Sequence, residues 1–185
     1  MYDHRYGDAI ALSEQTPSVR QNESLWLQYL VALASAGRRA DGLREVTAFV
    51  QRFPDRCAAR ALLAGLTLDR GANAARQLAA PILAEARKDD ARASVLACAT
   101  AAAAGLGDGV QVAALLQRII SNESLMRGWI LSGIAQSDGR LALRGDAYPW
   151  SNVVEQPPVV AVKQRLDAAF AREREIARAV LSGLP

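Results

Sequence analysis

Few side chains in this sequence have the chemistry that catalysis or metal binding requires. It has one histidine, His4, and two cysteines, Cys57 and Cys98, each within an alanine-rich segment. A zinc site draws its ligands from closely spaced His and Cys residues, and no second ligand lies near either cysteine in the sequence. We therefore predict two buried free thiols, with a bridge or a metal pair as the less favoured alternative.

One stretch has the glycine content of a phosphate-binding loop. It reads Gly105-Leu106-Gly107-Asp108-Gly109, but it lacks both the preceding strand and the Lys-Ser/Thr pair of such a loop. We interpret it as a turn between two helices. The acidic neighbours Asp89-Asp90 and Glu173/Glu175 are interpreted as a loop and a solvated helix face. The sequence thus predicts no catalytic residue, no cofactor and no metal site, and the chain is not expected to be an enzyme.

Charge and composition narrow the class of protein. Twenty arginines and two lysines are interspersed with 19 acidic residues, so no block of like charge marks a nucleic-acid-binding surface. Strong helix formers dominate, which predicts an all-α fold. The longest uncharged run, residues 93–107, is too short to span a bilayer. Without a signal sequence, and with two free thiols, the chain is expected to be cytoplasmic and to have no membrane partner.

The elements that would position any site follow a repeat. Gly37, Gly71, Gly105 and Gly139 recur every 34 residues. In the first three units an apolar helical stripe precedes the glycine and a second one follows it, which predicts a helix, a glycine turn and a second helix. A fixed period in this range is the signature of a helical repeat. After Gly139 the pattern decays, so we predict that the repeats end there.

The clearest unit resembles the tetratricopeptide repeat family. Trp26, Leu30, Gly37 and Pro54 stand where the family pattern places Trp, a small residue, Gly and Pro. Leu30 and Gly42 depart from the pattern, where the family prefers Gly or Ala and Ala, and these departures change packing rather than topology. The resemblance implies a right-handed α-solenoid of helix-turn-helix repeats, here followed by a long C-terminal capping helix.

The repeat pattern predicts a single domain made of consecutive segments. They are a partial repeat over residues 1–22, repeats over 23–56, 57–90 and 91–124, a degenerate repeat and loop over 125–156, and a C-terminal helix over 157–185. Pro81 falls inside a predicted helix and should kink it. Tyr148-Pro149-Trp150 predicts a structured loop that carries two aromatic residues. Because the chain begins with the second half of a repeat, we expect it to be a piece of a longer protein, with a degenerate terminal repeat as the alternative.

By analogy with the family, the first helix of each repeat lines a groove for a protein or peptide partner. The candidate groove residues are Leu27, Val31, Leu68, Val95, Trp129 and Gln136, with Ala34, Ala61, Gly65, Ala99, Ala102 and Gly133 beside them. This surface is apolar and lacks the Lys, Asn and Arg of family members that hold a peptide carboxylate, so that mode of binding is rejected. An apolar groove could instead receive an amphipathic helix. The C-terminal helix of this chain could also fill the groove or cap the stack.

Three functions are compatible with this reading. The leading hypothesis is a non-catalytic protein-interaction scaffold or regulatory module of a larger bacterial signalling protein, since RLDAAFAREREIARAVL loosely resembles the C-terminal regions of such proteins. The first alternative is a homo-oligomerisation module that forms a homodimer through the terminal helix or the Trp129 face. The second, less favoured, is a nucleic-acid-binding solenoid with Arg38, Arg39, Arg70 and Arg140 along one edge.

Overall fold

The computed structural model describes residues 6–126 and 148–183, and no strand occurs in these two ranges. The α-helices are α1 (Tyr6–Gln15), α2 (Glu23–Ser35), α3 (Arg39–Arg52), α4 (Cys57–Thr67), α5 (Ala72–Ala86), α6 (Ala93–Gly105), α7 (Gly109–Ile120) and α9 (Pro157–Ser182). Three short 3-10 helices are η1 (Pro17–Gln21), η2 (Leu68–Arg70) and η3 (Trp150–Asn152). The predicted all-α class is confirmed, and no helix in the described ranges is both long and apolar enough to cross a membrane.

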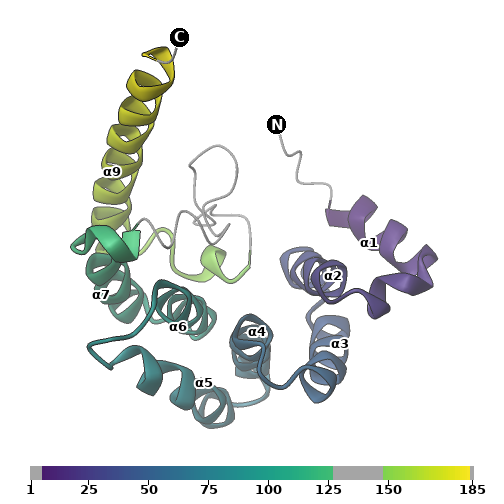
Figure 1. Ribbon diagram of the computed structural model, residues 1–185. Helices are drawn as coiled ribbons and strands as arrows, with labels where there is room; N and C mark the ends of the chain where they lie inside the picture. The colour runs from purple at the N-terminus through teal and green to yellow at the C-terminus, as the bar shows by residue number, and fades with distance from the viewer. Residues whose placement is uncertain (1–5, 127–147, 184–185) are drawn as a thin grey trace.

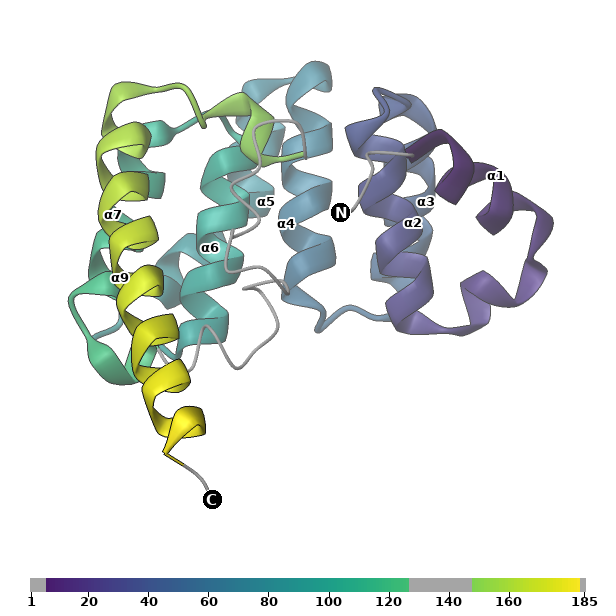
Figure 2. The ribbon, with the colours of Figure 1, turned by 90° about the horizontal axis from the view of Figure 1, so that it is seen from above.

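The helices follow one another along an arc (Figure 1). Helices α2, α4 and α6 form an inner row, and α3, α5 and α7 form an outer row. Helix α4 packs against α3, α5 and α6, and α6 packs in turn against α5 and α7. The view from above shows the inner-row helices standing beside one another (Figure 2). Each of the ranges 23–56, 57–90 and 91–124 contains one inner and one outer helix.

Two of the inner helices end in the same glycine turn. Gly37 follows α2 at φ 75°, and Gly107 follows α6 at φ 73°. The next residue in each case, Arg38 or Asp108, donates its backbone N–H to a carbonyl five residues back. This is the Schellman pattern, which satisfies carbonyl groups at the end of a helix and favours glycine because its backbone is left-handed.

The glycine turn of the third unit was predicted at the wrong residue. Gly105 is the last residue of α6 and is buried, while Gly107 makes the left-handed turn. The 34-residue period selects Gly105 because it assumes links of constant length, whereas the link between α5 and α6 is longer than the one between α3 and α4. Gly71 lies between η2 and α5, and Gly139 lies outside the described residues.

The apolar core has two parts. The first, at the N-terminal end, surrounds Trp26, Leu30 and Phe49. Trp26 is 5% exposed and meets the Phe49 ring edge to face, at 5.1 Å between ring centroids. The second part is built on the alanines of α6 and on the stripes of α7 and α9. Pro81 lies inside α5, which continues as a helix to Ala86.

The C-terminal helix packs against α7, the last of the outer-row helices. It begins at Pro157, as predicted, because proline has no N–H to lose in the first turn. Val159, Val162 and Leu166 are buried, and α9 packs against α7 rather than entering the inner row. The C-terminal end of α9 extends away from the other helices (Figure 1).

Candidate interaction surfaces

The candidate groove residues lie along the inner row, as far as they are described. Leu27 and Val31 of α2, Leu68 of η2 and Val95 of α6 are all half-buried. Trp129 and Gln136, with Gly133 and Arg140, lie outside the described residues. The remaining predicted positions, Ala34, Ala61, Gly65, Ala99 and Ala102, are buried.

The centre of the inner row is not an open groove, because residues 148–153 cover it. Trp150 and Val153 are 5% and 1% exposed and belong to the same core cluster as Ala61, Ala99 and Ala102. Of the two alternatives, an open groove and a groove filled by another part of this chain, the second describes this centre. The segment predicted as a structured loop with two aromatic residues lies at this position, and the C-terminal helix packs against α7.

Tyr148 contacts the inner row through its backbone, its ring and its hydroxyl group. Its backbone N–H donates to the Ser35 hydroxyl across 113 residues of sequence, at 3.1 Å. Its ring lies under the Arg39 guanidinium, 5.4 Å from the ring centroid, and Arg39 pairs with Asp69 at 2.6 Å. Its hydroxyl reaches the backbone of Gly65, where a methyl group would collide with it.

The Tyr148 hydroxyl is buried and has no hydrogen-bond partner within the described residues. Burial disfavours the phenolate, and this raises the pKa of Tyr148 to about 12 in spite of the nearby Arg39. The phenol is therefore neutral at ordinary pH and unsuited to act as a base. We name its surroundings, formed by Ser35, Arg39, Gly65 and Gly105, the Tyr148 socket.

Two amides join this segment to the turn between α6 and α7. The Asn152 side chain donates to the carbonyl groups of Ala104 and Gly105, at 3.4 and 3.5 Å. Gln156 accepts from the Gly109 N–H and donates to the Gly107 carbonyl, both at 3.1 Å. Asp108 caps α7 by accepting from the Gln111 N–H at 2.9 Å. The glycine-rich stretch is thus the predicted turn, and these amides are already bonded within the chain.

An open pocket of about 570 Å³ lies on the other side of this turn, against α5. Its lining combines an apolar middle, Ala80, Leu83, Leu106 and Val110, with Arg76, Arg87, Asp108, Gln111, Gln156 and the turn glycines. Arg76 and Arg87 are exposed, and no ion pair of either is found in the described ranges. Sequence reasoning missed this surface, although Arg76, Ala80, Leu83 and Arg87 follow the i, i+4, i+7, i+11 spacing of one helix face.

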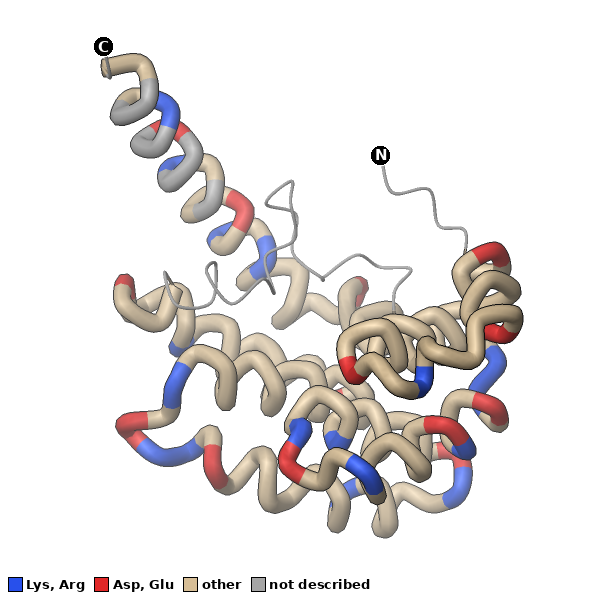
Figure 3. Tube along the Cα trace, turned by 45° about the vertical axis from the view of Figure 1, so that its right-hand side comes forward, with Lys and Arg blue, Asp and Glu red and all other residues tan. Residues whose placement is uncertain are grey.

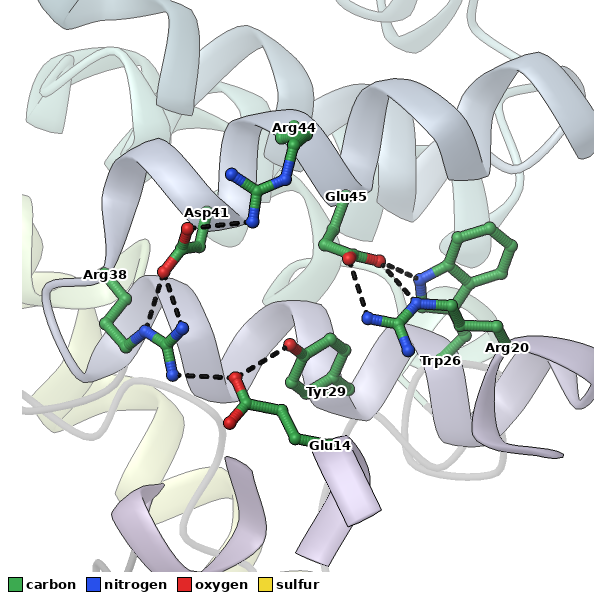
Figure 4. Close-up of polar contacts among 8 residues, drawn as sticks. All are labelled: Glu14, Arg20, Trp26, Tyr29, Arg38, Asp41, Arg44 and Glu45. Carbon is green, nitrogen blue, oxygen red and sulfur yellow. Dashed lines mark hydrogen bonds and ion pairs between the residues drawn. The ribbon is translucent and has the colours of Figure 1, made fainter. Parts of the chain in front are cut away.

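A polar cluster of eight residues joins α1, η1, α2 and α3 (Figure 4). At its centre, the Glu45 carboxylate accepts two hydrogen bonds from Arg20, at 2.7 and 3.0 Å, and one from the Trp26 indole at 3.2 Å. The Arg20 hydrogen bonds hold the pKa of Glu45 below its usual range, against an opposing effect of burial. A carboxylate stabilised as an anion in this way is a poor proton acceptor, so the cluster is structural.

The second half of the cluster is centred on Arg38. This guanidinium pairs with Glu14 of α1 at 2.8 Å and with Asp41 of α3 at 2.6 Å. Asp41 also binds Arg44, and its two arginine partners lower the pKa of its carboxyl group. Arg38 and Arg39, two residues of the predicted basic edge, are thus paired with acids. Acidic and basic residues are intermingled along the described trace (Figure 3).

The two cysteines are not separate thiols. Cys57 and Cys98 form a disulfide between α4 and α6, with their Cα atoms 5.9 Å apart. The prediction of two free thiols is wrong. It was based on the distance between the two cysteines along the sequence, which does not show that α4 and α6 lie side by side. Cys57 begins α4, whereas Cys98 lies further along α6, and the stagger of the two helices places them side by side. Within the described ranges, no group of three or more His, Cys, Asp or Glu could hold a metal ion.

A scan against protein-family models, a search of curated proteins and a search of solved structures each found no match for this chain.

Proposed function

We propose that the chain is a non-catalytic protein-interaction module, built as a right-handed α-solenoid of the tetratricopeptide type and belonging to a larger regulatory protein of the bacterial cytoplasm. Three features support the solenoid. Inner and outer helices alternate along the chain, the same glycine turn ends α2 and α6, and Trp26 is buried at the position that the family pattern gives to tryptophan.

The pocket between α5 and the α6–α7 turn carries this proposal. Residues 148–153 occupy the inner row, whereas this pocket is an open concave surface that a partner could reach. Arg76 and Arg87 stand at the two ends of its α5 wall, about 16 Å apart along the helix at 1.5 Å per residue. Between them lie Ala80 and the half-buried Leu83. A cationic group at each end of an apolar strip is complementary to a peptide with two acidic residues that flank apolar ones.

A helical peptide matched to this spacing tests the proposal. A labelled peptide with Glu at i and i+11 and Leu at i+4 and i+7 is titrated into the protein, beside a peptide of the same composition in scrambled order. Selection from a displayed random peptide library is run in parallel. We expect saturable binding that weakens at least tenfold in R76E/R87E, because each reversal replaces an attraction with a repulsion.

The matched control is R172E, which changes an exposed arginine of α9 by the same charge. We expect this variant to bind as the parent does. If the matched peptide does not bind, and no selected peptide depends on Arg76 and Arg87, the pocket is not the partner surface.

One observation also favours homodimerisation. Helix α9 continues to Ser182, and its C-terminal half extends away from the other helices (Figure 1). A second copy could use this half of the helix. Light scattering on the whole chain and on residues 1–169, which keep the buried residues Val159, Val162 and Leu166, separates the cases. A mass that halves on truncation supports the dimer, and a mass that stays monomeric in both excludes it.

A further inference from the structure

Helices α4 and α6 meet along a stripe of small residues with a cysteine pair at one end. On α4 the stripe is Cys57, Ala61 and Gly65, spaced four residues apart, and on α6 it contains Cys98, Ala102 and Gly105. This spacing places each set on one face of its helix. Cys57 faces Cys98 at a separation of 41 residues, and Gly65 faces Gly105 at almost the same separation. We call this contact the α4–α6 seam.

The glycine end of the seam is part of the Tyr148 socket. A Cβ on Gly65 would lie 2.1 Å from the Tyr148 hydroxyl and 2.9 Å from the Cα of Gly105. The fit of Tyr148 therefore depends on the separation between α4 and α6. The cysteines set that separation about two helical turns away. A change in the bond between them acts on the same pair of helices that forms the socket.

We propose that Cys57 and Cys98 are a reversible thiol–disulfide pair whose oxidation locks the α4–α6 seam and holds Tyr148 in its socket. The Cα separation of 5.9 Å lies within the usual range for disulfides. Both side chains are half-buried, which leaves them within reach of a small thiol reagent. The chain has two cysteines, so each has one partner within the molecule. In a reducing compartment such bonds are transient and serve redox sensing.

The reaction is a pair of thiol–disulfide exchanges with a low-molecular-weight disulfide such as oxidised glutathione. Cys57 is the first residue of α4 and is half-buried, and the exchange begins at its sulfur. Its sulfur attacks the glutathione disulfide, forms a mixed disulfide and releases one glutathione thiolate, which takes up a proton. The Cys98 thiol then loses its proton and attacks the Cys57 sulfur, which expels the second glutathione. In total, the two protein thiols lose two electrons and form one disulfide. Glutathione disulfide gains these electrons and becomes two glutathione thiols.

The experiment compares the whole chain after equilibration with oxidised glutathione and after reduction with dithiothreitol. Free thiols are counted by maleimide labelling under denaturing conditions and mass spectrometry. We expect none after oxidation and two after reduction. Closing this loop should raise Tm by about 10 °C in the oxidised form. Hydrogen exchange of the Tyr148 N–H, which is bonded to Ser35, should slow at least tenfold.

Two variants make the test specific. C57S/C98S should show no difference in Tm or exchange between the two treatments. C98S should accumulate a mixed disulfide of one glutathione on Cys57, because the resolving thiol is absent. If the folded parent keeps two free thiols in oxidised glutathione, the pair is not a redox site. If the bond forms but the exchange of Tyr148 is unchanged, the seam does not control the socket, and either result overturns the proposal.

Discussion

The Cα of Gly105 lies 2.9 Å from the point that a Cβ on Gly65 would occupy. Real Cβ atoms essentially never approach another atom so closely, so α4 and α6 can meet here only because both residues are glycine. Glycine inside a helix costs about 0.5–1 kcal/mol relative to alanine. The close packing of α4 against α6 accounts for two such residues at one contact. The Tyr148 hydroxyl group lies against this contact.

Gly65→Ala should therefore destabilise the protein. The added methyl group would meet the Tyr148 hydroxyl at 2.1 Å and the backbone of Gly105 at 2.9 Å, and the backbone contact cannot be relieved by a side-chain rotation. Overpacking of this kind typically costs about 1–3 kcal/mol. Urea unfolding measures the change. The control is Gly7→Ala on α1, where no atom lies within 4 Å of the new Cβ, and this variant should be neutral or slightly stabilising. Equal effects in the two variants would show that the seam is not tightly packed.

Tyr148→Phe should leave the protein equally stable or stabilise it. The ring keeps its contacts with Arg39 and the seam, while the variant lacks a buried hydroxyl that has no partner in the described residues. An unsatisfied buried polar group costs about 1–3 kcal/mol. Tyr148→Ala also removes the ring, and it should cost about 3–5 kcal/mol by analogy with other large aromatic truncations. Both values come from chemical unfolding. A loss above about 1 kcal/mol in the Phe variant would mean that the hydroxyl has a bonding partner.

The stability of the parent should fall at alkaline pH in a way that this Phe variant does not share. The pKa of Tyr148 is about 12 in the folded protein, above the ordinary value of 10.0. The folded protein therefore holds a proton that the unfolded chain has lost, and the stabilisation is complete below pH 10 and declines as the pH rises toward 12. Unfolding free energies between pH 9 and about 11 measure the slope, and tyrosinate absorbance should show a late step that Tyr148→Phe lacks. Parallel curves for parent and variant would contradict the burial of this phenol.

Glu45 should make the N-terminal end sensitive to acid. The Arg20 hydrogen bonds lower its pKa below the ordinary 4.5, so the stabilisation is present above pH 4.5 and is lost as the pH falls through the folded value. Glu45→Gln should lower stability at pH 7 by about 1–2 kcal/mol, a modest figure because the pair is partly exposed. In this variant the free energy of unfolding should also depend less steeply on pH in the acid range. Asp55→Asn is the control, since Asp55 is exposed and has no ion pair in the described part of the chain. An acid limb as steep in the Gln variant as in the parent would remove Glu45 as its cause.

The local part of the fold could be predicted from the sequence. The start of α9 at Pro157 and the turn at Gly37 each depend on residues within one or two helical turns, and Trp26 belongs to the apolar stripe of its own helix. Gly107 could not be chosen over Gly105 by the period, because both lie in one glycine-rich stretch. What distinguishes them is the packing of Gly105 against α4, which no local pattern records.

The contacts that define the candidate surfaces join residues that are far apart in the sequence, so a local pattern does not predict them. The hydrogen bond from Tyr148 to Ser35 spans 113 residues, and the cysteine pair depends on the stagger between α4 and α6 rather than on the 34-residue period. A search for small residues at four-residue spacing would have found Cys57, Ala61 and Gly65 as one face. The partner of that face could be identified only once α6 was placed beside it.

Trp26 gives the sharpest test of the N-terminal core. It is buried against Phe49 and Phe53, with ring centroids 5.1 and 6.4 Å away, and its indole N–H donates to Glu45. Trp26→Ala should cost about 3–5 kcal/mol, because it leaves a large cavity and removes a donor from a charged acceptor. Trp26→Phe keeps most of the aromatic packing and should cost less, which separates the two contributions. Equilibrium unfolding in urea measures both. A loss below about 0.5 kcal/mol in the Ala variant, the size expected at an exposed site, would show that Trp26 does not hold α2 against α3.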